Sequence, residues 1–600
     1  MNNSTIPTGV LHQELRLGVV TSVSASDIRI NLRNAGSPTA THFWGGRYGK
    51  GEVGEFVIVE GQTKFLFGRI ISVRLPEKER HEIHQDFVGN DHLDAIGIVQ
   101  ILGSIAIDTL RVTAGVDEYP RLGDRVYSAP HAFLAILPTL IDNDGTSKSI
   151  QLNLGTIASS SNTLSITPEK LFGRHCAILG ATGGGKSWTA ARLIEECLQY
   201  QGAKLILIDA TGEYHGFRCN NNDHIIHCHL GNPLLFADQS TSCLLPPTSF
   251  LESDFIALFE PSGKVQGPKL REAIRSLRLV QLDTSLASSM VIDGTVRKEG
   301  ALKKPFQDAE MRHAKSLENP RTSFDVRKLS RQIYNECIYS TAPRNDATRW
   351  GGADEANYSY CMSLIVRIDS ILTSPAFECI FSEDDTKEPI TKIISNFIEK
   401  DNGARMLRIC VSGISFEYKV REIVANAIAR HLLEHARCGR YRDQPLFVVL
   451  DEAHHFLGRH IGSEETVARL DAFELIAREG RKFGLNICFA TQRPRDITEG
   501  VLSQIGTLIV HRLTNEKDRE IVEKACGEID RSASAFLPNL KPGEATIIGV
   551  DFPIPLTIQI SQPKNKPKSD GPQYQTAWKE SCETADSGGN RQKIAAATTS

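Results

Sequence analysis

A glycine-rich loop between an apolar run and a helical segment constrains this chain more than any other feature. Cys176 to Leu179 is long enough for a buried strand, and the sequence then reads Gly180-Ala-Thr-Gly-Gly-Gly-Lys-Ser187. These residues fit the phosphate-loop pattern GxxxxGK[ST] at every fixed position, and the apolar spacing from Trp188 to Tyr200 is that of a helix. A glycine loop at a helix start offers backbone N–H groups and the positive end of the helix dipole to phosphate oxygens. The sequence therefore predicts that the chain binds a nucleoside triphosphate.

The individual residues of this loop can be given roles. Lys186 is expected to reach the β and γ phosphates of ATP, and Ser187 to ligate Mg²⁺. A glycine-rich turn that binds nothing is the alternative, and the strand-loop-helix context disfavours it. The residues that we assign to nucleotide binding are Gly180, Thr182, Gly183, Gly184, Gly185, Lys186, Ser187 and Trp188.

Composition narrows the class of protein. A chain of 600 residues with 40% hydrophobic and 23% charged residues is typical of a soluble protein with more than one domain. No apolar run approaches the roughly 18 residues of a membrane span, and the N-terminus lacks the layout of a signal peptide. The 13 cysteines are scattered without a CxxC pair, which predicts reduced thiols in the cytoplasm. A net charge of −4 does not indicate nucleic-acid binding, although basic residues can line a central channel.

The pattern along the chain predicts an α/β protein with additions. Short alternating runs predict a small β-barrel over residues 1–140, followed by a polar connector with one strand over 141–168. Buried strands alternate with helices over 169–243 and 401–562, which predicts the nucleotide-binding domain. Periodic segments over 244–400 predict a helical insertion, and the polar composition of 563–600 predicts a disordered tail.

An acidic pair follows one of the predicted buried strands. The run 445–450 ends in Asp451-Glu452, and such a strand end lies beside the phosphate loop in parallel α/β sheets. Asp451 is then suited to hold Mg²⁺ and Glu452 to polarise the attacking water. Asp209 and Glu213, at another strand end, are the alternative pair. We favour 451–452 because adjacent carboxylates separate metal binding from water activation.

Two further features could complete a catalytic site. Gln492 follows the apolar run 487–490, where a polar side chain can touch both the γ-phosphate and the attacking water, although a simple polar strand cap is equally compatible. Arg478, Arg481 and Lys482 end a predicted helix. They could supply a cation to a neighbouring subunit's site, or only complement the helix dipole.

Two clusters have less specific patterns. The His and Cys residues between His215 and His229 match no standard zinc spacing. The basic residues between Arg297 and Lys315 could touch DNA phosphate, but a solvated loop explains them as well.

Taken together, the motifs resemble those of the HerA family of hexameric DNA-pumping ATPases, which are kin to the FtsK translocases. The resemblance spans about residues 15 to 560 and covers the order of the motifs and the β-rich N-terminal region. The motifs that carry it are Gly180 to Ser187, Ile208-Asp-Ala-Thr-Gly-Glu-Tyr214, Val449-Leu-Asp-Glu-Ala-His454, Arg478-Glu-Gly-Arg-Lys-Phe-Gly484 and Ala490-Thr-Gln-Arg-Pro494.

The resemblance implies a RecA-like ATPase core with an N-terminal barrel and a helical insertion. It also implies a homohexamer with ATP and Mg²⁺ between subunits and double-stranded DNA in the pore. Arg481 and Arg174 become candidates for arginines that act across the subunit interface. The family pairs with a nuclease in end resection and repair, and some members pair with effectors in anti-phage defence.

The sequence is also compatible with two other functions. The ring could act mainly as a scaffold that assembles and regulates an effector, with ATP hydrolysis as a switch. It could also be a secretion or conjugation ATPase at a membrane, against which the missing membrane segment counts.

Overall fold

The computed structural model of this chain describes most of residues 11–568. Within that range it leaves out 33–39, 44–45, 76–94, 108–111, 117, 141–149, 159, 219–224, 233–239, 383, 385, 400–402, 458–459, 462–467, 527–530 and 551. Beyond residue 568 it describes residues 574, 575 and 578.

The N-terminal region forms a closed antiparallel β-barrel. Six strands follow one another in the order β2-β1-β9-β5-β6-β7, and β7 pairs back with β2 to close the barrel. The short strand β8 (Val112–Ala114) adds to β7. Side chains such as Ile28 and Val99 fill the interior because successive residues of a strand point to opposite faces. The six strands are β1 (Arg16–Val23), β2 (Asp27–Leu32), β5 (Phe56–Glu60), β6 (Lys64–Arg74), β7 (Ala95–Ala106) and β9 (Arg125–Ser128).

A sheet of thirteen strands forms the centre of the molecule. Nine strands are parallel, in the order β24-β12-β23-β20-β13-β19-β14-β15-β18, and β25, β26, β10 and β11 continue the sheet antiparallel beyond β24. The central strands β12, β20 and β23 are near-continuous buried runs because helices cover both faces of the sheet. The bounds of the parallel strands are β12 (Cys176–Leu179), β13 (Lys204–Asp209), β14 (Ile225–Gly231), β15 (Thr241–Leu244), β18 (Glu388–Pro389), β19 (Met406–Gly413), β20 (Leu446–Leu450), β23 (Leu485–Thr491) and β24 (Thr507–Val510).

The connector expected over residues 141–168 contributes more to this sheet than its composition suggested. Strands β10 (Leu152–Ile157) and β11 (Thr163–Ile166) form a hairpin, and β10 pairs with β26 (Phe552–Ile560). The prediction of one strand was therefore wrong. Polar residues dominate the turn and the exposed positions, whereas the alternate positions Leu152, Leu154 and Ile157 are buried.

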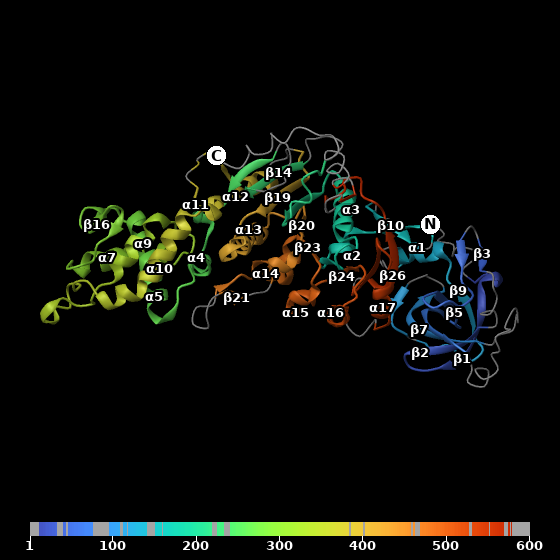
Figure 1. Cartoon of the computed structure of the whole chain (residues 1–600). Helices are drawn as coiled ribbons and strands as arrows, with labels where there is room; N and C mark the ends of the chain where they lie inside the picture. Colours follow the sequence, from blue (N-terminus) through green and yellow to red (C-terminus); the bar gives the residue numbers. More distant parts are fainter. Residues whose placement is uncertain are drawn as a thin grey trace, which may run out of the picture.

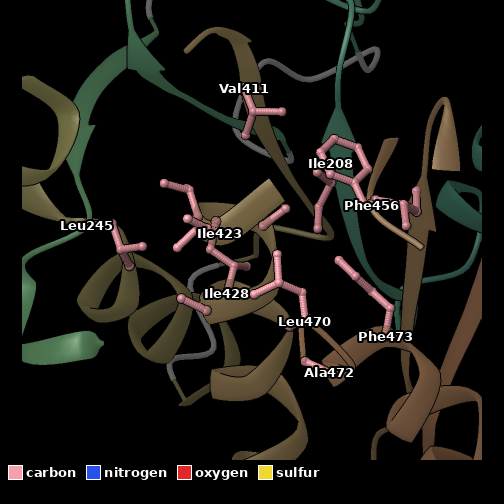
Figure 2. Close-up of a cluster of buried hydrophobic side chains, with 14 of the residues drawn as sticks. Ile208, Leu245, Val411, Ile423, Ile428, Phe456, Leu470, Ala472 and Phe473 are labelled. Atoms are coloured by element: carbon pink, nitrogen blue, oxygen red, sulfur yellow. The ribbon is translucent and has the colours of Figure 1, made fainter. Parts of the chain in front are cut away.

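The central strands of the sheet contribute to two hydrophobic clusters, one on each face. In β13, Ile206 and Ile208 pack toward α13 (Val420–Arg437) and α14 (Ala472–Glu479), whereas Leu205 and Leu207 pack in the cluster of α3 (Lys186–Leu198). Figure 2 shows part of the first cluster, with Ile208 and Val411 of the sheet beside Ile423 and Ile428 of α13. Successive buried side chains of a strand point to opposite faces of the sheet, so helices pack on both faces.

A helical region lies at the end of the molecule opposite the barrel (Figure 1). The chain leaves the sheet after β15 and returns through β18, which pairs with β15. The helices α5, α9 and α10 pack together, and none of the described helices combines the length and hydropathy needed to cross a membrane. The main helices are α4 (Glu252–Phe259), α5 (Gly263–Leu282), α7 (Lys303–Arg312), α9 (Leu329–Glu336), α10 (Glu355–Thr373), α11 (Glu378–Phe381) and α12 (Ile390–Glu399).

The chain beyond β26 departs from the expectation of a disordered tail starting at residue 563. Residues 563–568 pack on the ATPase core, with Pro563 and Pro567 buried. The composition, rich in Lys and Pro, has too few apolar residues to predict this packing.

Candidate nucleotide site

The glycine loop connects the centre of the sheet to helix α3. Strand β12 is fully buried between β24 and β23, and α3 begins at Lys186. Gly183 and Gly185 have φ values of 76° and 105°, which residues with a side chain rarely adopt. A Cβ at Gly180 would lie 2.6 Å from the Cβ of His511. Glycine is therefore required where the loop turns and where it approaches the end of β24.

Lys186 lies within a cluster of acidic side chains. Its side chain is buried, and its Nζ lies 3.4 Å from the carbonyl oxygen of Ala181 in the same loop. Burial lowers the pKa of Lys186, and the nearby carboxylates of Glu452, Asp451 and Glu213 act in the opposite direction. The predicted phosphate-binding lysine and the predicted acidic pair are thus brought together.

The acidic pair follows β20 at the carboxyl edge of the sheet. Asp451 is buried, and Thr211 donates a hydrogen bond from its hydroxyl to Asp451 Oδ2 at 3.3 Å. Burial, followed by the charges of Asp209, Glu452 and Glu213, raises the pKa of Asp451 well above its usual range. A bound cation would offset this crowding of negative charge.

Glu452 is held in an unusual conformation beside this carboxylate. Its φ of 44° and ψ of 50° lie in the left-handed region, where non-glycine residues are strained and concentrate at functional sites. Burial raises the pKa of Glu452, but hydrogen bonds from His454 and Gln492 and the charge of Lys186 outweigh it, so the pKa is lowered. Glu452 is therefore ionised at neutral pH and suited to accept a proton or to polarise water.

Gln492 links the glycine loop to Glu452. Its side-chain oxygen accepts a hydrogen bond from the hydroxyl of Thr182, and its amide nitrogen donates to Glu452 Oε1. Gln492 follows β23, which lies between β12 and β20. Because β23 lies between these two strands, the side chain of Gln492 can reach both the glycine loop after β12 and Glu452 after β20.

The residues present fit a magnesium ion and a nucleotide phosphate. Glu213 Oε2 is a buried atom without a hydrogen-bond donor. Burial raises the pKa of Glu213, and a hydrogen bond with the nearby hydroxyl of Ser187 acts in the opposite direction. Hard cations such as Mg²⁺ prefer oxygen ligands of this kind. Asp209, in contrast, is engaged by Arg408 at 2.7 Å and by the backbone N–H groups of Gly212 and Tyr214. This favours the pair 451–452 over Asp209 for the cation.

The two arginines expected to act between subunits lie at the opposite edge of the sheet. Arg174 precedes β12 and Arg481 precedes β23, and these strands are parallel and in register. The charge of Arg481 contributes to the lowered pKa of His175, about 4, in which burial is the larger cause. Arg478 instead pairs with Glu474 on α14. The structure therefore separates Arg174 and Arg481 from the glycine loop of their own chain.

Several residues around the loop carry no sequence signal that identifies them. His511, after β24, contacts the hydroxyl of Thr189 through Nε2 at 2.8 Å and the carbonyl oxygen of Glu544 through Nδ1 at 2.9 Å. His454 contacts both Thr491 and Glu452. These contacts join segments that are far apart in the chain, so only the strand order could have indicated them.

The remaining candidates have structural contacts. His227 and His229 lie on β14 and contact Phe217 and Ser240, while Cys219 and His224 fall outside the described residues. The described part of the chain brings no three His, Cys, Asp or Glu side chains together as a metal-ligand set.

The basic segment from Arg297 to Lys315 forms helices from Lys303 onward, and two of its basic side chains are engaged in ion pairs within the chain. Lys298 pairs with buried Glu336, and Arg312, at the end of α7, pairs with Asp283.

Strand, glycine loop, helix and acidic strand end together define a P-loop NTPase with a RecA-like core. The sequence model of the family described as "Helicase HerA, central domain" matches residues 152–346. The DNA double-strand break repair helicase HerA of Pyrococcus furiosus is 24% identical over 476 residues, which cover 78% of this chain and 77% of that protein. The protein of the same name from Saccharolobus solfataricus is 23% identical, covering 74% of each chain. The chain is therefore similar to HerA helicases over about three quarters of its length, in agreement with the resemblance of its motifs.

Two solved structures are similar to this chain at lower sequence identity. VirB4 of Thermoanaerobacter pseudethanolicus is 16% identical with a TM-score of 0.42, covering 70% of this chain and 98% of that one. The plasmid coupling protein TrwB in complex with ADP and Mg²⁺ is 15% identical with a TM-score of 0.41, covering 71% and 92%.

Proposed function

We propose that this chain is an ATP-driven translocase or helicase that acts on double-stranded DNA as a homohexamer and delivers it to a partner nuclease or defence effector. The placement of Arg174 and Arg481 carries this proposal. Strand β23 has seven residues, and a strand of that length spans about 23 Å. An arginine at its amino end cannot reach the glycine loop at the carboxyl edge of the same sheet. In a ring, the same arginine can face the next subunit's site.

Each residue of the site has a distinct role in phosphoryl transfer. Lys186 clamps the β and γ phosphates, and Glu452, oriented by Gln492, polarises the attacking water. Ser187 and Asp451 would hold Mg²⁺, which neutralises charge on the phosphates when it is bound. An arginine from the neighbour would stabilise the charge of the transition state. Each catalytic interface then requires two chains, which couples hydrolysis to movement around a ring.

The names of the relatives support DNA as the substrate. The proteins from Pyrococcus furiosus and Saccharolobus solfataricus are called DNA double-strand break repair helicases. The same ATP-driven motor could deliver DNA to a nuclease in repair or to an effector in defence. The proposal therefore specifies the motor and leaves the identity of the partner protein open.

A coupled measurement tests the proposal. The purified chain is incubated with ATP and Mg²⁺, with and without linear double-stranded DNA, and both hydrolysis and displacement of a labelled strand or roadblock are followed. DNA should stimulate hydrolysis, displacement should require ATP, and light scattering with an ATP analogue should show a six-subunit ring. If DNA does not stimulate hydrolysis and no strand or roadblock is displaced, the alternative is favoured. In that alternative the chain is a ring-forming scaffold that regulates an effector without processive translocation.

A further inference from the structure

The loop after β13 brings another acidic side chain to the nucleotide site. Gly212 and Tyr214 donate backbone N–H groups to the carboxylate of Asp209 at 2.7 and 3.2 Å. The fully buried guanidinium of Arg408 pairs with the same carboxylate. This loop is thereby held rigidly to the sheet. Glu213, which lies between the two anchored residues, is directed toward Ser187 and Lys186.

Glu213 has an unused acceptor in this position. Its Oε2 is buried and has no hydrogen-bond donor, although an unpaired buried carboxylate oxygen is costly. The fold therefore keeps a buried hydrogen-bond acceptor, Glu213 Oε2, near the hydroxyl of Ser187, which is the proposed Mg²⁺ ligand.

The segment that follows β26 ties this loop to helix α3. Asn565 donates from its backbone N–H and its side-chain amide to Glu195 Oε1 at 2.6 and 2.9 Å, and its Oδ1 accepts from the N–H of Arg218. Three residues later, the N–H of Lys568 donates to the carbonyl oxygen of Glu213 at 2.9 Å. We call residues 563–568 the strap.

The strap also passes over the first turn of α3. The ammonium of Lys566 lies 5.7 Å from the ring centre of Trp188, which is 37% exposed one residue after Ser187. Buried Pro563 and Pro567 restrict the backbone of the strap. The strap thus contacts Glu195 and Trp188 of α3 and ends at Glu213, in the loop after β13 beside the nucleotide site.

We propose that Glu213 is a positioning residue of the magnesium–nucleotide site, and that the strap holds its backbone in place. A serine that ligates Mg²⁺ offers an oxygen lone pair to the ion and must direct its O–H elsewhere. Glu213 is the acceptor for that proton, so its carboxylate orients the Ser187 hydroxyl. Acceptors behind a metal ligand fix its orientation and raise its basicity. This proposal rests on the proposed ATP hydrolysis at the same site.

Magnesium dependence of nucleotide binding tests the role of Glu213. Binding of a fluorescent ATP analogue is titrated with Mg²⁺ for the wild type, Glu213→Ala and Glu213→Gln, and repeated in EDTA. Loss of such an acceptor typically weakens metal binding about 10- to 100-fold. Glu213→Ala should raise the half-saturating Mg²⁺ concentration by that factor. Glu213→Gln should raise it less, because its amide oxygen still accepts from Ser187. Binding in EDTA should stay at the wild-type level.

The strap offers a matched pair of variants. Lys568→Pro removes the N–H that bonds Glu213, whereas Lys568→Ala keeps it and removes only the side chain. The first should shift the Mg²⁺ titration in the direction of Glu213→Ala and the second should not. Asn565→Ala, which removes the side-chain contacts to Glu195 and Arg218, should behave like Lys568→Pro. Thermal unfolding confirms that each variant is folded.

The outcomes separate the two levels of the proposal. A wild-type chain that binds no nucleotide overturns the proposed function together with this inference. A wild type with Mg²⁺-dependent binding that Glu213→Ala leaves unchanged overturns the inference alone. Equal titrations for Lys568→Pro and Lys568→Ala overturn the role of the strap.

Discussion

The side-chain amide of Gln492 donates a hydrogen bond to the carboxylate of Glu452, although 40 residues separate them in the chain. The same Gln492 accepts from Thr182 in the glycine loop. A single side chain therefore links the glycine loop to Glu452. In the proposed mechanism, this link connects the group that polarises water to the loop that binds the phosphates.

Replacing Glu452 with Gln should leave nucleotide bound but uncleaved. The amide keeps the size of the side chain and loses the charge that polarises water, a role that is worth about 10²–10⁴-fold in rate. Single-turnover hydrolysis and binding of a labelled ATP, measured on the same preparation, check this expectation. Normal turnover in this variant would transfer the role to another carboxylate.

Replacing Lys186 with Ala should weaken both nucleotide binding and hydrolysis. Lys186 is a buried cation close to the three carboxylates Glu213, Asp451 and Glu452, and its removal leaves their charge facing the phosphates. Removing one group that stabilises developing charge costs about 10²–10³-fold in rate. Binding should therefore distinguish this variant from Glu452→Gln. Unchanged affinity for ATP would show that Lys186 does not contact the phosphates.

Acid should destabilise the core partly through His511. Burial lowers the pKa of His511 to about 4, whereas in the unfolded chain it is about 6.5. Between these values the unfolded state binds more protons, so stability falls as the pH falls from 6.5 toward 4. The contribution lost by pH 5.5 is on the order of 1 kcal/mol.

His511→Asn tests this contribution. Asparagine can still donate to the Glu544 carbonyl and does not titrate, so the variant should lose less stability between pH 7.5 and 5.5 than the wild type. Thermal unfolding at the two pH values measures the difference. Parallel declines in both proteins would show that His511 is not the titrating group.

The sequence predicted those parts of the site that lie next to buried strands in the chain. Cys176–Leu179 and Leu446–Leu450 are uniformly apolar, so the polar residues after them could be placed at the carboxyl edge of one sheet. Lys186 and Asp451 followed from that placement. Gln492 followed in the same way, although its contacts with Thr182 and Glu452 depend on β23 lying between the other two strands.

Other parts depend on contacts that local patterns do not encode. Arg408 sits within an apolar strand, and only the pairing of β13 with β19 explains it as the partner of Asp209. The strap has the composition of a disordered segment, and its order comes from hydrogen bonds to Glu195 and Glu213. Both are long-range interactions, which neither periodicity nor composition reveals.

The position of Arg481 leads to a prediction about mixed rings. Arg481 lies before β23, at the amino edge of the sheet, so its own glycine loop is out of reach. Arg481→Ala should leave nucleotide binding nearly intact and reduce hydrolysis about 10³–10⁵-fold, the effect of losing an arginine finger. Equilibrium binding and steady-state hydrolysis on the same protein measure the two effects separately.

Mixing this variant with Lys186→Ala is the decisive comparison. An interface that joins an intact Lys186 site to an intact Arg481 from the other chain should recover hydrolysis, so mixed rings should work when neither parent does. Arg478→Ala is the matched control, because Arg478 pairs with Glu474 on its own helix and its loss should leave hydrolysis unchanged. If subunits exchange and the mixtures stay inactive, Arg481 is only a helix-end cation. Arg174, at the same edge of the sheet before β12, then becomes the arginine to test in the same mixing experiment.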